Sequence, residues 1–431
     1  MSGMTVYFNA RLVDPASGRD ERGGLIVRDG RIADLGPHVT ATEGADVVDC
    51  GGHVLAPGLI DMHAFVGEPG MEHKETLASL GDAAAAGGIT SVVVMPNTDP
   101  VLDEVALIQH LERRADNTAS VNIHPMAAIT KGLKGETMTE MALLREAGAV
   151  AFTDGRRAVA NPLVMSRAMR YASAFDLLLV QHPEDPIMAS DGCMTEGELA
   201  MRLGLPEIPV EAETILIERD LRLAAAAGCR YHVAQISCGQ AVEVVRQARK
   251  RNPRISCGVA AHHFALNEQA VGQYRTFAKT SPPLRSEDDR QAMVAAIADG
   301  TIDVIVSGHD PQDEESKRLP FQEAAYGTIG LETLLPLALE LYHKGEVPLA
   351  RVLGALTHRP AELLGLEAGR LAPGRPADLV LFDLDRPDRI EKQKFRSKSK
   401  NSAFDGRPVQ GRVLRTVVGG TPVFGGTDAH P

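Results

Sequence analysis

The sequence predicts an α/β protein: a (β/α)8 barrel that carries a small β-sandwich built from both ends of the chain. Short apolar runs alternate with amphipathic stretches through the middle of the chain, and both ends have a strand-and-turn pattern without a helical period. The 431 residues leave room for one barrel of roughly 250 residues or more and a smaller domain. We expect the barrel over residues 57–366 and the β-sandwich over residues 1–56 and 367–431.

The two ends of the chain are expected to form strands joined by turns. Asp-Pro, Asp-Gly and Gly-Gly pairs separate segments that are rich in β-forming residues. The expected strands lie at residues 6–13, 24–27, 31–35, 45–55, 378–383 and 413–418. Because both ends have this character, we expect them to share one small domain. Two unrelated β extensions are the alternative.

The middle of the chain is expected to supply the barrel. Its short apolar runs lie at residues 91–95, 121–128, 149–152, 177–180, 231–236, 255–259 and 304–307. The amphipathic stretches between them include residues 78–86, 105–114, 138–146 and 211–227. Seven or eight strand–helix units favour a closed barrel over an open parallel sheet. The absence of a GxGxxG or Walker motif argues against a nucleotide-binding fold.

Composition and charge exclude several classes of protein. The chain has 45 Lys and Arg against 57 Asp and Glu, a net charge of −12, which argues against nucleic-acid or anionic-lipid partners. No apolar run approaches the roughly 20 residues of a membrane helix. Five dispersed cysteines without a CxxC pair indicate a reducing compartment, so we expect a cytoplasmic protein. The basic run at residues 394–400 is expected to be a solvated loop, with a phosphate- or partner-binding patch as the alternative.

Polar residues follow the expected barrel strands, where the reacting groups of such barrels lie. His63, Asp154 and His182 come after three of these strands in chain order. Imidazole nitrogens and carboxylate oxygens that converge from several strands suit a borderline metal such as zinc. The three residues are therefore candidate metal ligands. For each histidine taken alone, a structural role in the core is the alternative.

Several motifs give the chain a family resemblance. Residues 57–63 (PGLIDMH) resemble the entry motif of the amidohydrolase superfamily. The motifs MPNT, FTDG, SPPLR and GTIGLET, at residues 95–98, 152–155, 281–285 and 327–333, resemble those of type I dihydroorotases. The similarity covers nearly the whole chain, including the terminal β segments. It implies a cyclic amidohydrolase of pyrimidine biosynthesis that uses zinc.

The resemblance also assigns roles to individual residues. It implies that His63, Asp154 and His182 are metal ligands and that Asn97 and Gly327 contact the substrate. Six other positions depart from the family pattern. The second metal-binding histidine is replaced by Phe65, the substrate-gripping arginine by Gly67, a further ligand histidine by Gln235, the catalytic aspartate by Gly308 and a later histidine by Gln312. Ser281 replaces the asparagine that opens the family's Asn-Pro-Pro-Leu-Arg motif.

These departures weaken both metal binding and catalysis. Phe65 cannot bind a metal and Gln235 offers only a neutral amide, so we expect either one weak zinc site or none. Proton transfer by a positioned side chain contributes roughly 10²–10⁴ in rate, and Gly308 has no side chain to provide it. Gly67 cannot replace an arginine that holds a carboxylate. We therefore expect no catalytic residue in the family's positions.

Three functions remain open at this stage. The resemblance implies a catalytically impaired or inactive homologue that acts as a partner of aspartate carbamoyltransferase and forms a homo-oligomer. The first alternative is an active dihydroorotase with a rearranged one-metal site. In that case Asp310 takes the acid–base role and His309, His262 or His263 replaces a missing ligand. The second alternative is an amidohydrolase for another cyclic amide, because Phe65 and Gly67 would make the pocket less polar and roomier.

Overall fold

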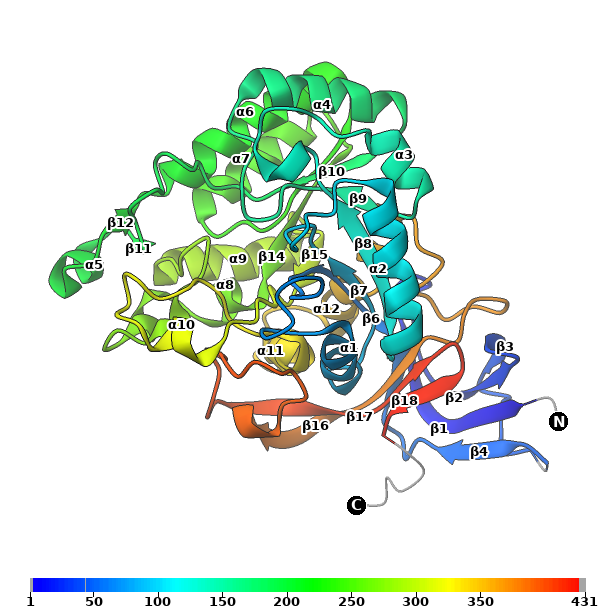
Figure 1. The fold of residues 1–431 in the computed structure, drawn as a ribbon. Helices are drawn as coiled ribbons and strands as arrows, with labels where there is room; N and C mark the ends of the chain where they lie inside the picture. The colour runs from blue at the N-terminus through cyan, green and yellow to red at the C-terminus, as the bar shows by residue number, and fades with distance from the viewer. Residues whose placement is uncertain (1–2, 43, 426–431) are drawn as a thin grey trace.

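The computed structural model describes residues 3–42 and 44–425. It consists of a parallel barrel surrounded by helices and a mixed sheet that both ends of the chain build along one side of it (Figure 1). Among the described residues, no helix combines the length and the apolar character needed to cross a membrane.

Eight parallel strands form the barrel, in the order β15-β14-β13-β10-β9-β8-β7-β6. They are β6 (Leu59–Ala64), β7 (Ile89–Val94), β8 (Asn122–Ala127), β9 (Ala151–Phe152), β10 (Leu178–Gln181), β13 (Arg230–Val233), β14 (Ile255–Ala260) and β15 (Val304–Val306). A parallel bridge joins Ala64 of β6 to His309, just beyond the end of β15, and the Asp61 carboxylate accepts the Ser307 N–H at 3.0 Å. The seven predicted apolar runs all coincide with strands, which confirms the barrel.

Helices cover the outside of the barrel (Figure 1). The longer ones are α1 (Leu77–Ala86), α2 (Val105–Thr118), α3 (Met141–Glu146), α4 (Pro162–Ala174), α6 (Glu211–Ala227), α7 (Gly239–Arg249), α9 (Glu287–Asp299), α11 (Leu334–His343), α12 (Leu349–Leu356) and α13 (His358–Leu364). Local signals set several helix starts. Thr76 and Ser79 form a capping box at α1, and Asn161 caps α4 with Pro162 in its first turn.

Short elements lie mainly in the loops of the barrel. They are α5 (Glu198–Leu203), α8 (Ala261–Ala265), α10 (Glu314–Arg318), β11 (Met194–Thr195), β12 (Glu207–Ile208) and five 3-10 turns, η1 (Lys131–Leu133), η2 (Glu268–Val271), η3 (Thr276–Ala278), η4 (Leu331–Thr333) and η5 (Lys392–Lys394). Together, β11, α5 and β12 form an arm that projects away from the barrel (Figure 1).

The terminal sheet has the order β18-β17-β16-β5-β1-β2-β3, with β4 beside β1. Its strands are β1 (Met4–Asp14), β2 (Arg19–Arg28), β3 (Arg31–Gly36), β4 (Asp46–Asp49), β5 (Val54–Pro57), β16 (Leu379–Arg389), β17 (Pro408–Val418) and β18 (Thr421–Phe424). Strand β5 pairs with β1 on one side and with β16 on the other, so the two ends of the chain form one sheet. The alternative of two unrelated extensions is therefore wrong. The exact domain boundaries stay a prediction.

The barrel interior is apolar except at one end. Ile60, Val93, Leu178 and Val304 belong to one buried cluster inside the barrel, to which α13 contributes Ala361 and Leu364. Phe65, just after β6, belongs to the same cluster. A separate, larger cluster packs the strands against the surrounding helices. Polar side chains therefore concentrate where the strands end, which we call the barrel mouth.

Candidate active site at the barrel mouth

The structure brings the predicted ligands to the same end of the barrel. His63 lies near the end of β6, Asp154 follows β9 and His182 follows β10. All three side chains are buried. Because parallel strands end at one rim, their shared position follows from the topology. Their roles as ligands stay predictions.

Asp154 already has hydrogen-bond partners in the loop that follows β8. Its Oδ1 accepts the backbone N–H groups of Ile129 and Thr130, both at 2.9 Å, and its Oδ2 accepts the Thr130 hydroxyl. Burial raises the pKa of Asp154 to about 6, although these bonds oppose the shift. The carboxylate therefore ties the β8 loop to the end of β9.

The two predicted histidine ligands are buried and only partly satisfied. Nδ1 of His63 has no hydrogen-bond partner, and the ring packs edge-on against Phe65 with centroids 5.4 Å apart. Burial, with a smaller contribution from His182, lowers the pKa of His63 to about 3. Nε2 of His182 lies 2.9 Å from the Ser281 hydroxyl, which donates to Glu184 at 3.0 Å. Nδ1 of His182 is left without a partner.

The residues present do not fit the zinc that the resemblance implies. Among residues 3–42 and 44–425, no group of three or more His, Cys, Asp and Glu side chains is arranged to hold a metal ion. Phe65 places an aromatic ring beside His63, and Gln235 turns its amide nitrogen to the Ser281 carbonyl at 3.1 Å. Nδ1 of His63 and Nδ1 of His182 thus lack hydrogen-bond partners without belonging to a metal-binding group in the described residues.

The three histidines that were considered as replacement metal ligands, His262, His263 and His309, make contacts of their own. His262 and His263 pack against each other with centroids 4.3 Å apart, and Nε2 of His263 donates to the Pro282 carbonyl at 3.1 Å. Nδ1 of His309 accepts the Gly330 N–H at 3.2 Å, and its Nε2 lies 3.6 Å from Glu75. Burial lowers the pKa of His263 to about 3. These hydrogen bonds favour structural roles for His263 and His309, whereas neither ring nitrogen of His262 has a hydrogen-bond partner.

The backbone around two of the departures is adapted to glycine. Gly308 has φ +59°, and a Cβ there would lie 2.9 Å from Cε1 of His262 and 3.0 Å from the Ala260 Cβ. Gly67 donates its N–H to the Glu75 carbonyl at 3.1 Å, and a Cβ on it would lie 2.0 Å from the Met71 carbonyl oxygen. An aspartate or an arginine at these positions would therefore require the local backbone to move.

Sequence reasoning missed Arg156. It follows Gly155, whose φ of +66° turns the chain after Asp154. The Arg156 guanidinium lies over the Phe65 ring, 4.7 Å from its centroid, and forms an ion pair with Asp310. Burial lowers the pKa of Arg156 to about 10, so the side chain stays charged at neutral pH. The sequence does place a cationic residue two positions after the predicted ligand Asp154. The direction of the Arg156 side chain, however, depends on the turn at Gly155.

The two predicted substrate contacts adjoin this ion pair. A Cβ on Gly155 would lie 3.4 Å from the Asn97 side chain, and one on Gly327 would lie 2.4 Å from Oδ2 of Asp310. Asp310 also accepts the Gln312 side-chain amide at 2.9 Å. Gly327 therefore lies against the ion pair itself, and Asn97 lies beside the residue that precedes Arg156. Contact with a substrate stays a prediction for Asn97 and Gly327.

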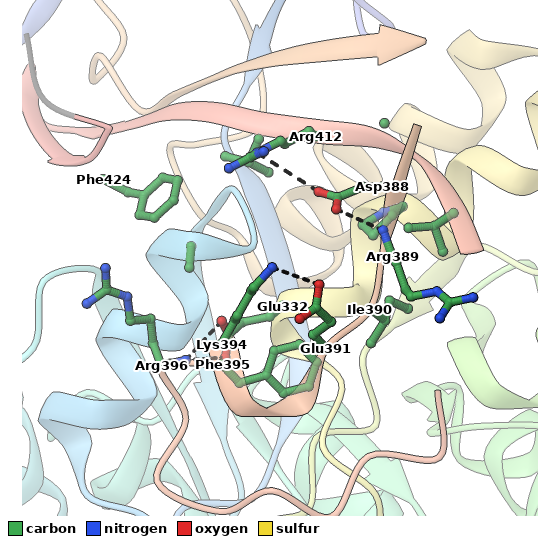
Figure 2. A pocket seen from close by; sticks show the side chains of 15 residues that line it. Glu332, Asp388, Arg389, Ile390, Glu391, Lys394, Phe395, Arg396, Arg412 and Phe424 are labelled. Carbon is green, nitrogen blue, oxygen red and sulfur yellow. Dashed lines mark hydrogen bonds and ion pairs between the residues drawn. The ribbon is translucent and has the colours of Figure 1, made fainter. Parts of the chain in front are cut away.

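A separate cavity of about 280 Å³ lies away from the barrel mouth, between the terminal sheet and the 3-10 turns η4 and η5. Figure 2 shows Lys394 directed at Glu391 and Arg412 directed at Asp388, in ion pairs of 2.7 and 4.0 Å. Nζ of Lys400 donates to the Phe395 and Ser397 carbonyls, both at 2.6 Å. The basic run at residues 394–400 thus uses several of its charges within the loop, which favours the solvated-loop interpretation.

Comparison with known proteins supplies several matches. The family described as dihydro-orotase-like matches residues 52–241, and the amidohydrolase family matches residues 330–424. A protein named dihydroorotase from Anaplasma phagocytophilum (strain HZ) is 47% identical over 424 residues, 97% of this chain and 94% of that protein. A dihydroorotase from Geobacter sp. (strain M21) is 41% identical over 96% of this chain and 97% of its own length. The solved structure of L-hydantoinase (dihydropyrimidinase) from Arthrobacter aurescens has a TM-score of 0.89 and 26% identity, covering 99% of this chain and 96% of its own.

Proposed function

Because this chain belongs to the dihydroorotase family, we propose that it serves pyrimidine biosynthesis as a catalytically impaired homologue that acts as a partner of aspartate carbamoyltransferase. In this proposal the barrel is kept for assembly, and metal-dependent ring closure has been lost. The full-length match to dihydroorotases supports the pathway, and the barrel mouth supports the impairment.

The observation that carries the proposal is the state of the Asp154 carboxylate. An ionised carboxylate has about four lone-pair sites, and the β8 loop already occupies two on Oδ1 and one on Oδ2 of Asp154. Asp154 therefore offers a metal no more than one lone pair, on Oδ2. Two neutral imidazoles and one oxygen that is already shared with the Thr130 hydroxyl would bind zinc weakly.

The family's position for the side chain that transfers a proton is empty at the barrel mouth. Gly308 offers no side chain, and the nearby Asp310 carboxylate is shared between Arg156 and Gln312. To take up a proton, Asp310 would have to release one of these two partners. Without a carrier, formation of dihydroorotate should be at least about 10²-fold slower than in an enzyme that has one.

Metal content and turnover test the proposed impairment directly. The full chain, purified and then incubated with zinc, should hold well below one metal ion per chain by elemental analysis. It should show no interconversion of carbamoyl aspartate and dihydroorotate. Stoichiometric zinc together with turnover that His63→Ala abolishes would refute the impairment.

The partnership is tested by the mass of the complex. The chain should form a homo-oligomer alone and a larger, stable complex when mixed with aspartate carbamoyltransferase from the same organism. Light scattering after size exclusion reports both. Two separate species at micromolar concentrations of each would refute the partnership.

Two specific observations favour the alternatives. Identity of 47% with a protein named dihydroorotase favours an active enzyme, whose Asp310→Asn variant would then be inactive. The likeness to L-hydantoinase favours an amidohydrolase for another cyclic amide. Hydrolysis of neutral hydantoins by a chain that does not act on dihydroorotate would select the latter.

A further inference from the structure

Arg156 places a fixed cation inside the barrel mouth. One face of its guanidinium lies on the Phe65 ring at 4.7 Å, and one edge is paired with Asp310. Stacking on an aromatic face and pairing with a carboxylate both restrict the position of a guanidinium. The side chain is therefore held in place before any ligand arrives.

Most donors of this guanidinium remain available. A guanidinium carries five N–H donors, and in the described part of the chain the only polar partner of Arg156 is Asp310. The side chain is 28% exposed, so the remaining donors can be reached from the mouth. A planar, pre-positioned guanidinium with free donors matches the geometry of a carboxylate.

Charges of both signs surround Arg156. Lys74 and Lys317 lie close enough to Arg156 for their charges to interact with it, and Asp310 and Glu184 are acidic groups near it. Burial, with smaller contributions from Arg156 and Lys279, lowers the pKa of Lys317 to about 7, and its Nζ donates to the Thr276 carbonyl at 2.9 Å and to the Ala325 carbonyl at 2.6 Å. The attraction for an anionic ligand therefore comes mainly from Arg156 itself.

We propose that Arg156 forms a metal-independent binding site for a small organic carboxylate at the barrel mouth. The ligand's carboxylate pairs with the free edge of the guanidinium, and Asp310 is the internal counter-ion with which it competes. The Asn97 side chain, beside Gly155, lies next to the polar remainder of the ligand. The inference rests on the proposed function in one respect, that no metal takes part in binding.

Calorimetric titration of the chelator-treated full chain tests the site. The probes are succinate and N-carbamoyl-aspartate, with hydantoin as a neutral cyclic amide. Both carboxylates should bind, with an affinity that falls as salt is raised, and hydantoin should not bind. Binding of hydantoin as tight as that of the carboxylates, or carboxylate binding that appears only after zinc is added, would overturn the proposal.

Two matched variants locate the site. Arg156→Gln should weaken carboxylate binding by about tenfold or more, since a charge-assisted bond is lost. Arg157→Gln, at the exposed neighbouring residue, should leave the affinity unchanged. Arg156→Lys, which keeps the charge without the planar fork, should bind more weakly than the parent but more tightly than Arg156→Gln. Equal affinity in the parent and in a folded Arg156→Gln variant, judged by its thermal melt, would refute the proposal.

The counter-ion is tested by Asp310→Asn. Removal of the competing carboxylate should tighten succinate binding several-fold, whereas unchanged or weaker binding would contradict the role given to Asp310. The failure of this proposal can be distinguished from the failure of the proposed function. The titrations are made in chelator and report binding without metal, so turnover with bound zinc would refute only the proposed catalytic impairment.

Discussion

Among the arginines that pair with carboxylates in this molecule, Arg285 and Arg156 have different surroundings. Arg285, beside the root of the arm formed by β11, α5 and β12, is 1% exposed and pairs with Glu213 at 3.4 Å. Its other donors reach the Ser237 hydroxyl, the Thr195 hydroxyl and the Ile208 carbonyl at 3.0 to 3.2 Å. Arg156, at the barrel mouth, is 28% exposed and has one polar partner within the described part of the chain. A guanidinium with four of its five donors bonded inside the protein holds the fold together, whereas one with most donors free is equipped to bind a ligand.

The largest expected effect is a difference in unfolding free energy between variants of these two arginines. Arg285→Met leaves Glu213 buried without its counter-charge and should cost about 3–5 kcal/mol of unfolding free energy. Arg156→Met leaves the Gln312 amide on the buried Asp310 carboxylate and removes a cation that is itself 28% exposed, so it should cost less, about 1–3 kcal/mol. Urea denaturation of the two variants measures the difference. Equal losses would mean that Arg156 is as structural as Arg285.

The next effect concerns the backbone of the mouth. Gly308→Asp restores the residue type that the resemblance implies, yet it places a side chain at φ +59° against His262 and Ala260. We expect a loss of about 1–3 kcal/mol and no gain of turnover. Gly345→Asp is the matched control, because Gly345 has φ +71° with open space around it. If Gly308→Asp loses no more unfolding free energy than this control and restores activity, the backbone at the barrel mouth accommodates a side chain that its contacts indicate it should not.

The mouth should also make the fold sensitive to acid. Burial lowers the pKa of His63 to about 3 in the folded chain, while the unfolded chain takes up a proton near 6.5. Stability is therefore lost as the pH falls from about 6.5 towards 3, and one such histidine contributes up to about 2 kcal/mol by pH 5. His63→Leu should flatten the dependence of unfolding free energy on pH over this range. An unchanged slope would show that the His63 ring is reached by water.

The sequence predicts the strands better than it predicts the mouth. Strands buried on both faces appear as continuous apolar runs, so β7 and β14 could be located from residues 91–95 and 255–259 alone. The partners of Asp154 could not be found in this way, since Thr130 lies 24 residues away in a loop without periodicity. The direction of Arg156 depends on the turn at Gly155 and on the ring of Phe65, which a linear pattern does not reveal.

The smallest expected effect tests whether the aromatic ring keeps Arg156 ready to bind. Phe65→Leu retains an apolar side chain in the barrel cluster but removes the face on which the guanidinium lies, a contact of about 0.5–1 kcal/mol at a partly exposed site. Succinate affinity should then fall about two- to fivefold, less than in Arg156→Gln, because the charge remains and only its restraint is lost. Titration of the chelator-treated variant measures this change, and a thermal melt controls for the loss of packing. Affinity equal to that of the parent would show that Asp310 alone positions Arg156.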